Sequence, residues 1–443
     1  MLAENFCNSP WMHLRITYDG SFVPCRWFEK TTDASVDNIK HTSMNDYWNG
    51  PEMSALRTQF TKGKSPSACK HCYYQDQYDK LSGRYKQLLK GGIIKNDFEN
   101  TLVGSHQFKD FNYSDNNNGT TTRPITDLQI DLGTICNSAC VMCWAGASSR
   151  LHKDYKKLHQ IDNAIFEYPK PRSDWIDNDK VFDKWLDDLC THNIRYLHLL
   201  GGETLYIPQF YKICERLIER KLSHKMILGT TTNGTIFNER LTKIIPYFKQ
   251  FHLGISVEAF DPVNDYIRYP GKIKNIETNI KSFLKFKSKY KNLFCSLRIT
   301  PSVLSVMNVD SVFNFMIENN ITAESCNILD NPNCLRIEYL PNDLRKKSIQ
   351  SIEQVIKKHQ IQPTWKLVNI RGHDTHRISI SNTIYEYLDF LKNYKTPTDV
   401  DEVRPLTARF LNGFDKLRKN NLWQYNTDLA KYLEAYGYNS TSN

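Results

Sequence analysis

The sequence of 443 residues contains no apolar run long enough to cross a bilayer, and this absence excludes a membrane-spanning helix. Its first residues, Met1 to Cys7, lack the basic and then apolar layout of a secretion signal. Dense basic runs with interleaved aromatic residues are also missing, so the sequence has no specific nucleic-acid motif. We therefore expect a cytoplasmic protein with no membrane partner, in which cysteine thiols stay reduced.

Cysteine is the residue type that the sequence does have in number. Twelve cysteines in a reducing compartment indicate metal or cluster ligands rather than disulfides. The rest of the composition is ordinary for a folded protein, with 40% hydrophobic and 24% charged residues, and the length suits two or three domains. The formal net charge of +10 would suit an anionic partner, although a solvated basic surface explains it more simply.

Three cysteines at Cys-x3-Cys-x2-Cys spacing follow an alternating, strand-like run from Leu128 to Leu132. They are Cys136, Cys140 and Cys143. Three thiolates on one short loop can hold three corners of a four-iron cluster, and the fourth iron is then open to a substrate or cofactor. The alternatives are a zinc loop that lacks its fourth ligand, or three buried thiols.

A second group of four cysteines lies in the first 85 residues: Cys7, Cys25, Cys69 and Cys72. Residues 11–17 and 21–25 flank an Asp19-Gly20 turn, which predicts a β-hairpin that brings Cys7 and Cys25 to the same end. Cys69-x2-Cys72 is a tight pair, or knuckle. A hairpin and a knuckle can together ligate one metal centre with four thiolates. A structural zinc ion and independent buried cysteines are the alternatives.

The middle of the chain alternates strand-like and helical segments. Repeated strand–helix units predict a parallel sheet with right-handed crossovers, and six units fit an open, partial (β/α)6 barrel of the TIM type. Chemistry in parallel barrels lies at the carboxyl ends of the strands. The expected strands are Asp127–Leu132, Arg195–Leu200, Lys225–Thr232, Phe251–Val257, Phe294–Thr300 and Ala323–Leu329.

These patterns divide the chain into four parts. Residues 1–85 form a small hairpin-and-knuckle cluster domain, and the polar, turn-rich residues 86–124 form a linker. Residues 125–335 form the α/β core, and residues 336–443 form a helical region that closes the barrel or completes a substrate pocket. The helices expected outside the core are Asp46–Thr58, Leu344–His359 with Asp343 as its N-cap, Ser379–Leu391, Leu406–Leu417 and Thr427–Leu433.

Polar residues that can hydrogen-bond a ligand follow the ends of the expected strands. The glycines after the second strand allow close backbone approach to a ligand. Ser256 and Glu258, two residues apart on the fourth strand, are expected to point the same way. Plain alternatives are ordinary turns and, for Arg298, an ion pair in the barrel wall. The candidate binding residues are Gly201, Gly202, Glu203, Thr232, Asn233, Ser256, Glu258 and Arg298.

The cysteine spacing, the Gly201-Gly202-Glu203 turn and the segment Ser256-x-Glu258 with its following Asp265-x-x-Arg268 resemble the motifs of the radical S-adenosylmethionine (radical SAM) superfamily. The resemblance implies that the open iron binds the amino and carboxylate groups of SAM. It also implies that Glu203 grips the SAM ammonium, that Arg298 pairs with the carboxylate, and that the other candidates contact ribose or substrate. Thr204 in place of the usual proline and Glu258 in place of the usual aspartate depart from the family pattern.

The first 85 residues are similar to the SPASM/twitch auxiliary-cluster domain. That domain usually follows the catalytic core, whereas here it precedes it. No cysteine lies between Tyr73 and Arg84, as in the shorter twitch form, so the resemblance implies one auxiliary [4Fe-4S] cluster with an electron-transfer or structural role. The residues that carry the similarity are Cys7, Pro10-Trp11, Asp19-Gly20, Pro24-Cys25, Asn38-Ile39, Tyr47-Trp48, Arg57 and Cys69-x2-Cys72.

The resemblance also implies a reaction. An electron donor such as flavodoxin or ferredoxin reduces the [4Fe-4S] cluster. The reduced cluster cleaves SAM to a 5′-deoxyadenosyl radical, which takes hydrogen from a substrate. We expect oxidation or cross-linking of a peptide or protein side chain, with modification of a nucleotide or sugar as the second possibility. A zinc-stabilised binding protein without catalysis is the alternative from another class.

Overall fold

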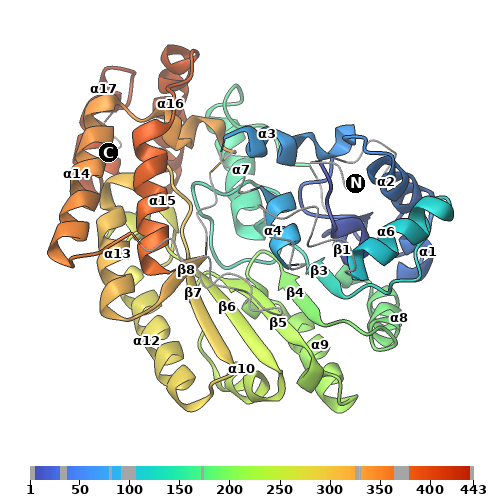
Figure 1. Cartoon of the computed structure of the whole chain (residues 1–443). Helices are drawn as coiled ribbons and strands as arrows, with labels where there is room; N and C mark the ends of the chain where they lie inside the picture. The colour runs from blue at the N-terminus through green and yellow to red at the C-terminus, as the bar shows by residue number, and fades with distance from the viewer. Residues whose placement is uncertain are drawn as a thin grey trace.

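The computed structural model describes residues 5–29, 37–78, 82–90, 106–170, 174–324, 329, 331–363 and 379–439. An eight-stranded sheet forms its centre, in the order β2-β1-β3-β4-β5-β6-β7-β8. The N-terminal helices stand at one end of this sheet and the C-terminal helices at the other (Figure 1). In these ranges, every helix is too short or too polar to span a lipid bilayer.

Six parallel strands confirm the expected core, and each pairs with the next in chain order. Residues 325–328 of the last expected strand lie outside the described residues. The strands are β3 (Asp127–Asp131), β4 (Tyr196–Leu200), β5 (Ile227–Thr232), β6 (Gln250–Ser256), β7 (Leu293–Arg298) and β8 (Thr322–Glu324). The main helices between them are α7 (Ser149–Ile161), α8 (Asp179–Leu189), α9 (Pro208–Glu219), α10 (Glu239–Ile244), α11 (Val263–Ile267), α12 (Ile273–Lys289) and α13 (Val309–Glu318).

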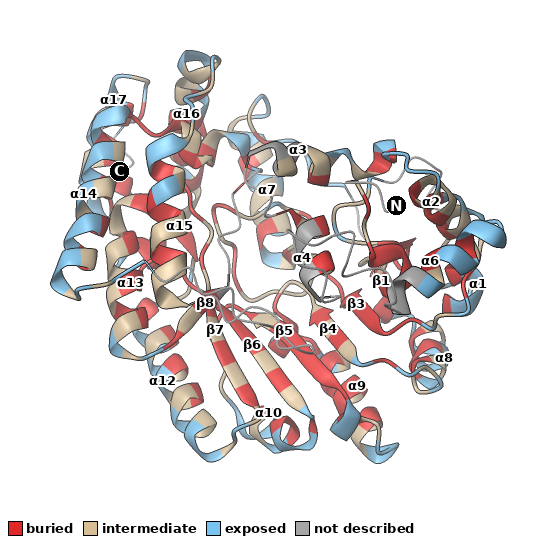
Figure 2. Cartoon of the chain, viewed as in Figure 1, coloured by how far each residue is buried: buried red, intermediate tan, exposed pale blue. Residues whose placement is uncertain are grey.

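The two faces of this sheet differ in chemistry. One register row on the core face consists of Leu128, Leu197, Leu228, Phe251 and Leu293, all fully buried. The neighbouring row on the opposite face begins with Gln129 and His198 and continues through Gly229 and His252. Buried residues concentrate in the strands and on the inner sides of the helices (Figure 2). The sheet therefore packs one apolar face and turns a polar face toward the inside of the barrel.

The N-terminal hairpin is confirmed as β1 (His13–Ile16) and β2 (Phe22–Val23), which pair antiparallel. The sequence did not predict that β1 also pairs in parallel with β3, from His13 opposite Asp127 to Ile16 opposite Ile130. The hairpin thus continues the core sheet past β3. Strand pairing of this kind depends on residues more than a hundred positions apart, which a local pattern does not specify. The domain boundaries at 85 and 124 stay predictions.

The expected helix over 46–58 is two helices, α1 (Met44–Trp48) and α2 (Pro51–Thr61). The break occurs because Pro51 has no N–H to donate and its fixed φ suits the first position of a new helix. The fully buried Arg57 on α2 donates hydrogen bonds to the carbonyls of Pro10 (2.8 Å), Trp48 (2.8 Å) and Gly119 (3.2 Å). Burial lowers the pKa of Arg57 to about 10, and its backbone contacts join three separate segments.

The segment expected to be a linker contains helix α6 (His106–Asn116), which packs against α2. Its Phe111 joins a small apolar core with Phe6, Trp11 and Phe60. The polar composition of 110–123 concealed Phe111, because a helix needs only one apolar stripe to be buried. Helices α3 (Lys70–Tyr78) and α4 (Gly83–Lys90) complete the described N-terminal part.

Four C-terminal helices are confirmed: α14 (Asn342–Lys358), α15 (Ile380–Asn393), α16 (Val400–Arg418) and α17 (Thr427–Glu434). The expected N-cap of the first was wrong. Pro341 is the cap, and Asp343 lies in the first turn, where its charge still favours the helix dipole. Helix α16 begins six residues earlier than expected and contains Pro405 within its first two turns.

Helix α16 lies close against α7 and the segment that follows it. A Cβ atom on Gly413 would stand 2.5 Å from Cε2 of Phe166, which is fully buried between Phe410 and Phe414. This close approach determines how closely α16 packs on α7 and on the segment that carries Phe166. Glycine allows it because it has no side chain.

The packing of α16 predicts that Gly413→Val lowers the free energy of unfolding by about 1–3 kcal/mol, because the new side chain overpacks Phe166. The matched control is Lys416→Val on the exposed side of the same helix, which changes stability by no more than roughly 0.5–0.7 kcal/mol. Urea denaturation of both variants measures the difference. Equal losses for the two variants would show that the glycine is not required for packing.

Candidate functional site

The loop that carries Cys136, Cys140 and Cys143 (the cysteine loop, residues 133–148) follows β3 and is held on one side by the Gly-Gly-Glu turn. The N–H of Gly202 donates to the carbonyl of Gly133 (2.9 Å), and that of Glu203 donates to the carbonyl of Ile135 (2.8 Å). A Cβ on Gly202 would lie 2.5 Å from the Ile135 oxygen. Glycine at 202 is therefore required by the approach of two loops to each other. Its approach to a ligand stays a prediction.

A second segment, residues 267–269, holds the cysteine loop from the other side. The N–H groups of Ala139 and Val141 donate to the carbonyls of Tyr269 (2.7 Å) and Ile267 (2.8 Å). Between these two carbonyls, Arg268 places its Nη2 2.8 Å from Oε1 of Glu258 and its Nη1 3.9 Å from Sγ of Cys140. Arg268 is thus a buried cation that lies beside a thiol and is paired with a buried carboxylate.

A third contact comes from the C-terminal region, in which the sequence showed no motif. Arg418, the last residue of α16, donates from Nη2 to the carbonyl of Ala139 (2.5 Å) and to the carboxylate of Asp154 (3.1 Å). Its side chain is 4% exposed. No local signal marks it, because basic residues commonly end helices for reasons of capping alone.

The carboxylate of Glu203 is enclosed by the protein. It accepts hydrogen bonds from the N–H of Asn233 (2.6 Å), the hydroxyl of Thr232 (2.7 Å) and the N–H of Leu205 (3.1 Å). Burial raises the pKa of Glu203, while the hydrogen bonds from Asn233 and Thr232 oppose the rise. The structure therefore brings together three of the predicted residues, Glu203, Thr232 and Asn233.

This group is also joined to the cysteine loop. Nδ2 of Asn233 donates to Oδ1 of Asn137 (2.7 Å) and to the hydroxyl of Ser138 (2.9 Å). The chain of hydrogen bonds from Glu203 through Asn233 to Asn137 runs across the ends of β4, β5 and β3. It fixes the position of the cysteine loop relative to the strand ends.

Ser256 is the last residue of β6 and Arg298 is the last residue of β7, with Glu258 two residues beyond the end of β6. Strand β6 ends at Ser256, so the period of two does not have to hold at Glu258, and the shared direction of Ser256 and Glu258 stays a prediction. The Glu258 carboxylate is fully buried, where it binds Arg268 and accepts a hydrogen bond from the N–H of Thr300 (2.9 Å). Arg298 is paired in register with Ser256 and lies across Gly254, where a Cβ would stand 2.3 Å from its Nε.

The thiols of the cysteine loop lie close to one another and to positive charge. Burial and, after it, the charge of Cys140 raise the pKa of Cys136 and of Cys143 to about 12. At Cys140, burial also raises the pKa, but the guanidinium groups of Arg268 and Arg418 oppose it. Thiols that repel one another as anions in a partly buried loop fit a cationic group that binds all three.

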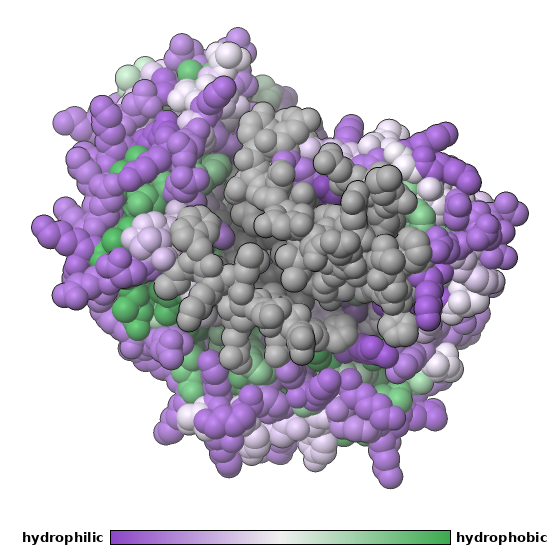
Figure 3. All heavy atoms as spheres, in the orientation of Figure 1, coloured by the Kyte–Doolittle hydropathy of each residue, from purple (hydrophilic) through white to green (hydrophobic). Residues whose placement is uncertain are grey.

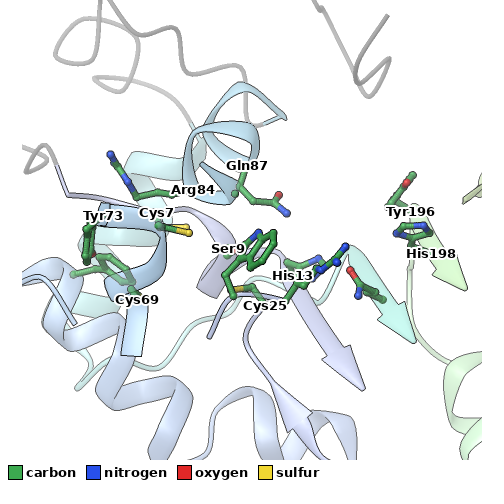
Figure 4. Close-up of a pocket in the computed structure, with 16 residues that line it drawn as sticks. Cys7, Ser9, His13, Cys25, Cys69, Tyr73, Arg84, Gln87, Tyr196 and His198 are labelled. Atoms are coloured by element: carbon green, nitrogen blue, oxygen red, sulfur yellow. The ribbon is translucent and has the colours of Figure 1, made fainter. Parts of the chain in front are cut away.

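The four N-terminal cysteines surround one cavity of about 180 Å³ (Figure 4). Burial raises the pKa of Cys7 to about 12 and of Cys25 to about 11, and it raises those of Cys69 and Cys72 as well. The charges of the other three thiols contribute to the rise at Cys69. The structure therefore brings the cysteines of the hairpin and of the knuckle together around one cavity. The sequence predicted this grouping for Cys7, Cys25, Cys69 and Cys72.

The spacing of these side chains bears on the choice between a cluster and a zinc ion. Within the part of the chain that the structure describes, no three His, Cys, Asp or Glu side chains converge closely enough to bind a single metal ion. Thiolates that bind different irons of a cluster stand further apart than the ligands of one ion. Four thiols around one cavity supply the ligand type that both groups use.

The same cavity extends to the polar face of the sheet, which sequence reasoning missed. Figure 4 places His13 between the cysteines and the side chains of Tyr196 and His198 on β4. The signal was present in the strands, since alternate positions of His13–Ile16, Asp127–Asp131 and Tyr196–Leu200 are polar. A buried parallel strand is normally apolar on both faces, so this alternation indicates a face that meets solvent or ligand.

Comparisons with known proteins agree with the two cysteine groups. A family model described as the radical SAM superfamily matches residues 130–300, and one described as an iron-sulfur cluster-binding domain (SPASM) matches residues 7–73. No curated protein matches the chain.

Three solved structures illustrate the level of structural similarity. Native anSMEcpe with bound AdoMet has a TM-score of 0.38 and 18% identity, over 53% of this chain and 62% of that chain. Streptococcus suis SuiB bound to S-adenosylmethionine has a TM-score of 0.36 and 14% identity, over 81% and 71%. SuiB bound to the precursor peptide SuiA has a TM-score of 0.38 and 13% identity, over 94% and 79%. The chain thus spans less than two thirds of the length of anSMEcpe.

The matched ranges contain the cysteine loop and the four N-terminal cysteines, with the auxiliary domain before the core as expected. The cofactors that belong to these domains are a [4Fe-4S] cluster and SAM in the core, and an auxiliary iron–sulfur cluster in the N-terminal part. Residues 130–300 therefore belong to the radical SAM superfamily, and residues 7–73 form an N-terminal SPASM domain.

Proposed function

We propose that the chain is an enzyme that cleaves SAM reductively at a [4Fe-4S] cluster and abstracts hydrogen from a substrate. The observation that carries the proposal is the cysteine loop at the carboxyl ends of the parallel strands, held by the Gly202 turn and by residues 267–269. Cys136, Cys140 and Cys143 would hold the cluster. When bound, the cluster and SAM supply the electron transfer and the group that abstracts hydrogen.

The residues at the strand ends have a supporting role in this proposal. Glu203, Thr232 and Asn233 fix the cysteine loop through Asn137 and Ser138, and so hold the place where SAM binds. Gly201 allows the side chain of Ile207 to approach its backbone closely, and Ser256 with Arg298 presents a hydroxyl and a cation on the inner face. Glu258 acts through Arg268, since its carboxylate is taken up by that guanidinium.

Cys7, Cys25, Cys69 and Cys72 would hold the auxiliary [4Fe-4S] cluster. Their cavity is shared with Gln129, Tyr196 and His198 on the inner face of the sheet. A substrate inside the barrel would therefore lie between the two cysteine groups, close enough to the auxiliary cluster to pass an electron to it. An external one-electron donor such as flavodoxin or ferredoxin completes the proposal.

The proposed substrate is a peptide or protein side chain, which is oxidised or cross-linked. The polar inner face offers hydrogen-bonding groups from three strands to a substrate that is itself rich in donors and acceptors. A nucleotide or sugar is the second candidate, because the same groups can bind hydroxyls.

Cys140→Ala should abolish release of 5′-deoxyadenosine from SAM in anaerobically reconstituted protein with dithionite, because the cluster loses one of three ligands. Iron should fall from about eight to about four per chain. The matched control is Cys190→Ala, a half-buried thiol outside both groups, which should retain iron and activity. Equal release from Cys140→Ala and the unaltered protein would end the proposal.

Replacing both Cys69 and Cys72 with alanine should separate the two sites. The variant should still cleave SAM, because the cysteine loop is intact, but it should no longer turn over substrate. Iron should again fall to about four per chain, and the remaining signal should respond to SAM. A zinc content of about one per chain in the unaltered protein would instead assign the N-terminal group to a structural ion.

Deuterium transfer tests the substrate class. Peptide, nucleotide and sugar pools labelled with deuterium are incubated separately with the reduced enzyme and SAM, and 5′-deoxyadenosine is examined by mass spectrometry. We expect deuterium in 5′-deoxyadenosine from the peptide pool alone. Transfer from the nucleotide or sugar pool would move the proposal to its second candidate.

A further inference from the structure

The strongest unexplained feature lies where the C-terminal helices meet the cysteine loop. Arg418 ends α16 and is 279 residues from Ala139, whose carbonyl accepts its hydrogen bond. The guanidinium lies between two aromatic rings, 4.6 Å from the centre of Tyr269 and 4.4 Å from that of Phe414. A cation in this position is fixed in direction by one backbone carbonyl, one carboxylate and two rings.

The donors of Arg418 are only partly used. Nη2 makes both of the hydrogen bonds described above, whereas Nε and Nη1 are buried and have no hydrogen-bond partner among the described residues. Burying donors of a cation without partners is costly, so a protein that needed only a tether would not require a guanidinium here. The unpartnered donors indicate that the charge itself has a role.

A second cation lies beside the loop at Cys140, the residue that follows Ala139. Nη1 of Arg268 stands 3.9 Å from Sγ of Cys140, and the side chain of Arg268 is 10% exposed. Arg268 is neutralised by the fully buried Glu258, and Arg418 is paired with Asp154, whose side chain is 19% exposed. The carboxylate beside Arg418 is therefore better screened by solvent than the one beside Arg268, so Asp154 offsets less of its partner's charge than Glu258 does.

We infer that Arg418 and Arg268 form a pair of fixed positive charges beside Cys140 that raises the reduction potential of the cluster held by the cysteine loop, with Arg418 supplied by the C-terminal region. The inference rests on the proposed function, since it requires a cluster at Cys136, Cys140 and Cys143. In this inference helix α16, residues 400–418, positions Arg418, and the charge of Arg418 acts on the cluster at the cysteine loop.

The physical reason is the charge of the reduced site. A cluster bound by three thiolates is anionic, and the incoming electron makes it more so in a loop with little solvent. Reduction potentials of such clusters depend on net charge, on hydrogen bonds to sulfur and on exposure. Two nearby cations stabilise the reduced form more than the oxidised form, and removal of either should make the cluster harder to reduce.

The test is an anaerobic redox titration of the reconstituted holoenzyme, followed by electron paramagnetic resonance. The signal that changes when SAM is added identifies the cluster at the cysteine loop and separates it from the auxiliary cluster. For Arg418→Gln, we expect the equilibrium constant for reduction to fall at least about tenfold, which is a midpoint about 59 mV more negative for a one-electron couple. Arg418→Lys, which keeps the charge, should shift it less.

The matched control is Arg409→Gln on the same helix, where the arginine pairs with Asp162 and is 48% exposed. It should leave the midpoint unchanged. Iron content and circular dichroism are measured first, so that loss of the cluster or of the fold in Arg418→Gln is recognised. In that event Asp154→Asn decides, because removing this carboxylate frees the charge of Arg418 and should move the midpoint in the positive direction.

The outcomes separate the two levels of inference. If the unaltered protein shows no signal that responds to SAM, the proposed function fails. If that signal is present, the cluster assignment stands. The role of Arg418 is overturned if Arg418→Gln has the same midpoint as the unaltered protein. It is also overturned if Asp154→Asn leaves the midpoint unchanged or makes it more negative.

Discussion

The structure depends on the close approach of the cysteine loop to the turn at Gly202. At this point two backbones lie so near each other that a single Cβ would collide with the carbonyls of Thr134 and Ile135. The approach aligns the N–H of Glu203 with Ile135 and brings its carboxylate beneath Asn233. Because backbone contacts are short and directional, they place three thiols at the strand ends more rigidly than side-chain packing would.

The two faces of the sheet explain how one scaffold serves two cysteine groups. The apolar face packs under helices and supplies stability, whereas the polar face lines the interior where substrate and SAM are proposed to bind. Pairing of β1 with β3 extends this polar face directly to the N-terminal cysteines. On the face of the molecule shown in Figure 3, hydrophilic residues form most of the outline.

The sequence predicted what local spacing controls and missed what distant contacts control. Cysteine spacing, strand alternation and the Asp19-Gly20 turn are local, so the two cysteine groups, the six core strands and the hairpin were predictable. The pairing of β1 with β3 and the hydrogen bond from Arg418 to Ala139 join residues 114 or more apart. Pro51 and Gly50, which divide one expected helix, were a local signal that apolar periodicity outweighed.

The position of Arg418 gives the C-terminal helices a reason to be ordered against the core. Helix α16 is set against α7 by Gly413, and just over one turn later the guanidinium of Arg418 lies over the rings of Phe414 and Tyr269. Tyr269 itself holds the N–H of Ala139, so the same residue connects the loop, the segment after α11 and the last turn of α16. A shift of α16 along its axis would therefore displace the cysteine loop, both through these backbone hydrogen bonds and through the charge of Arg418. These contacts connect the position of α16 to the position of the cysteine loop.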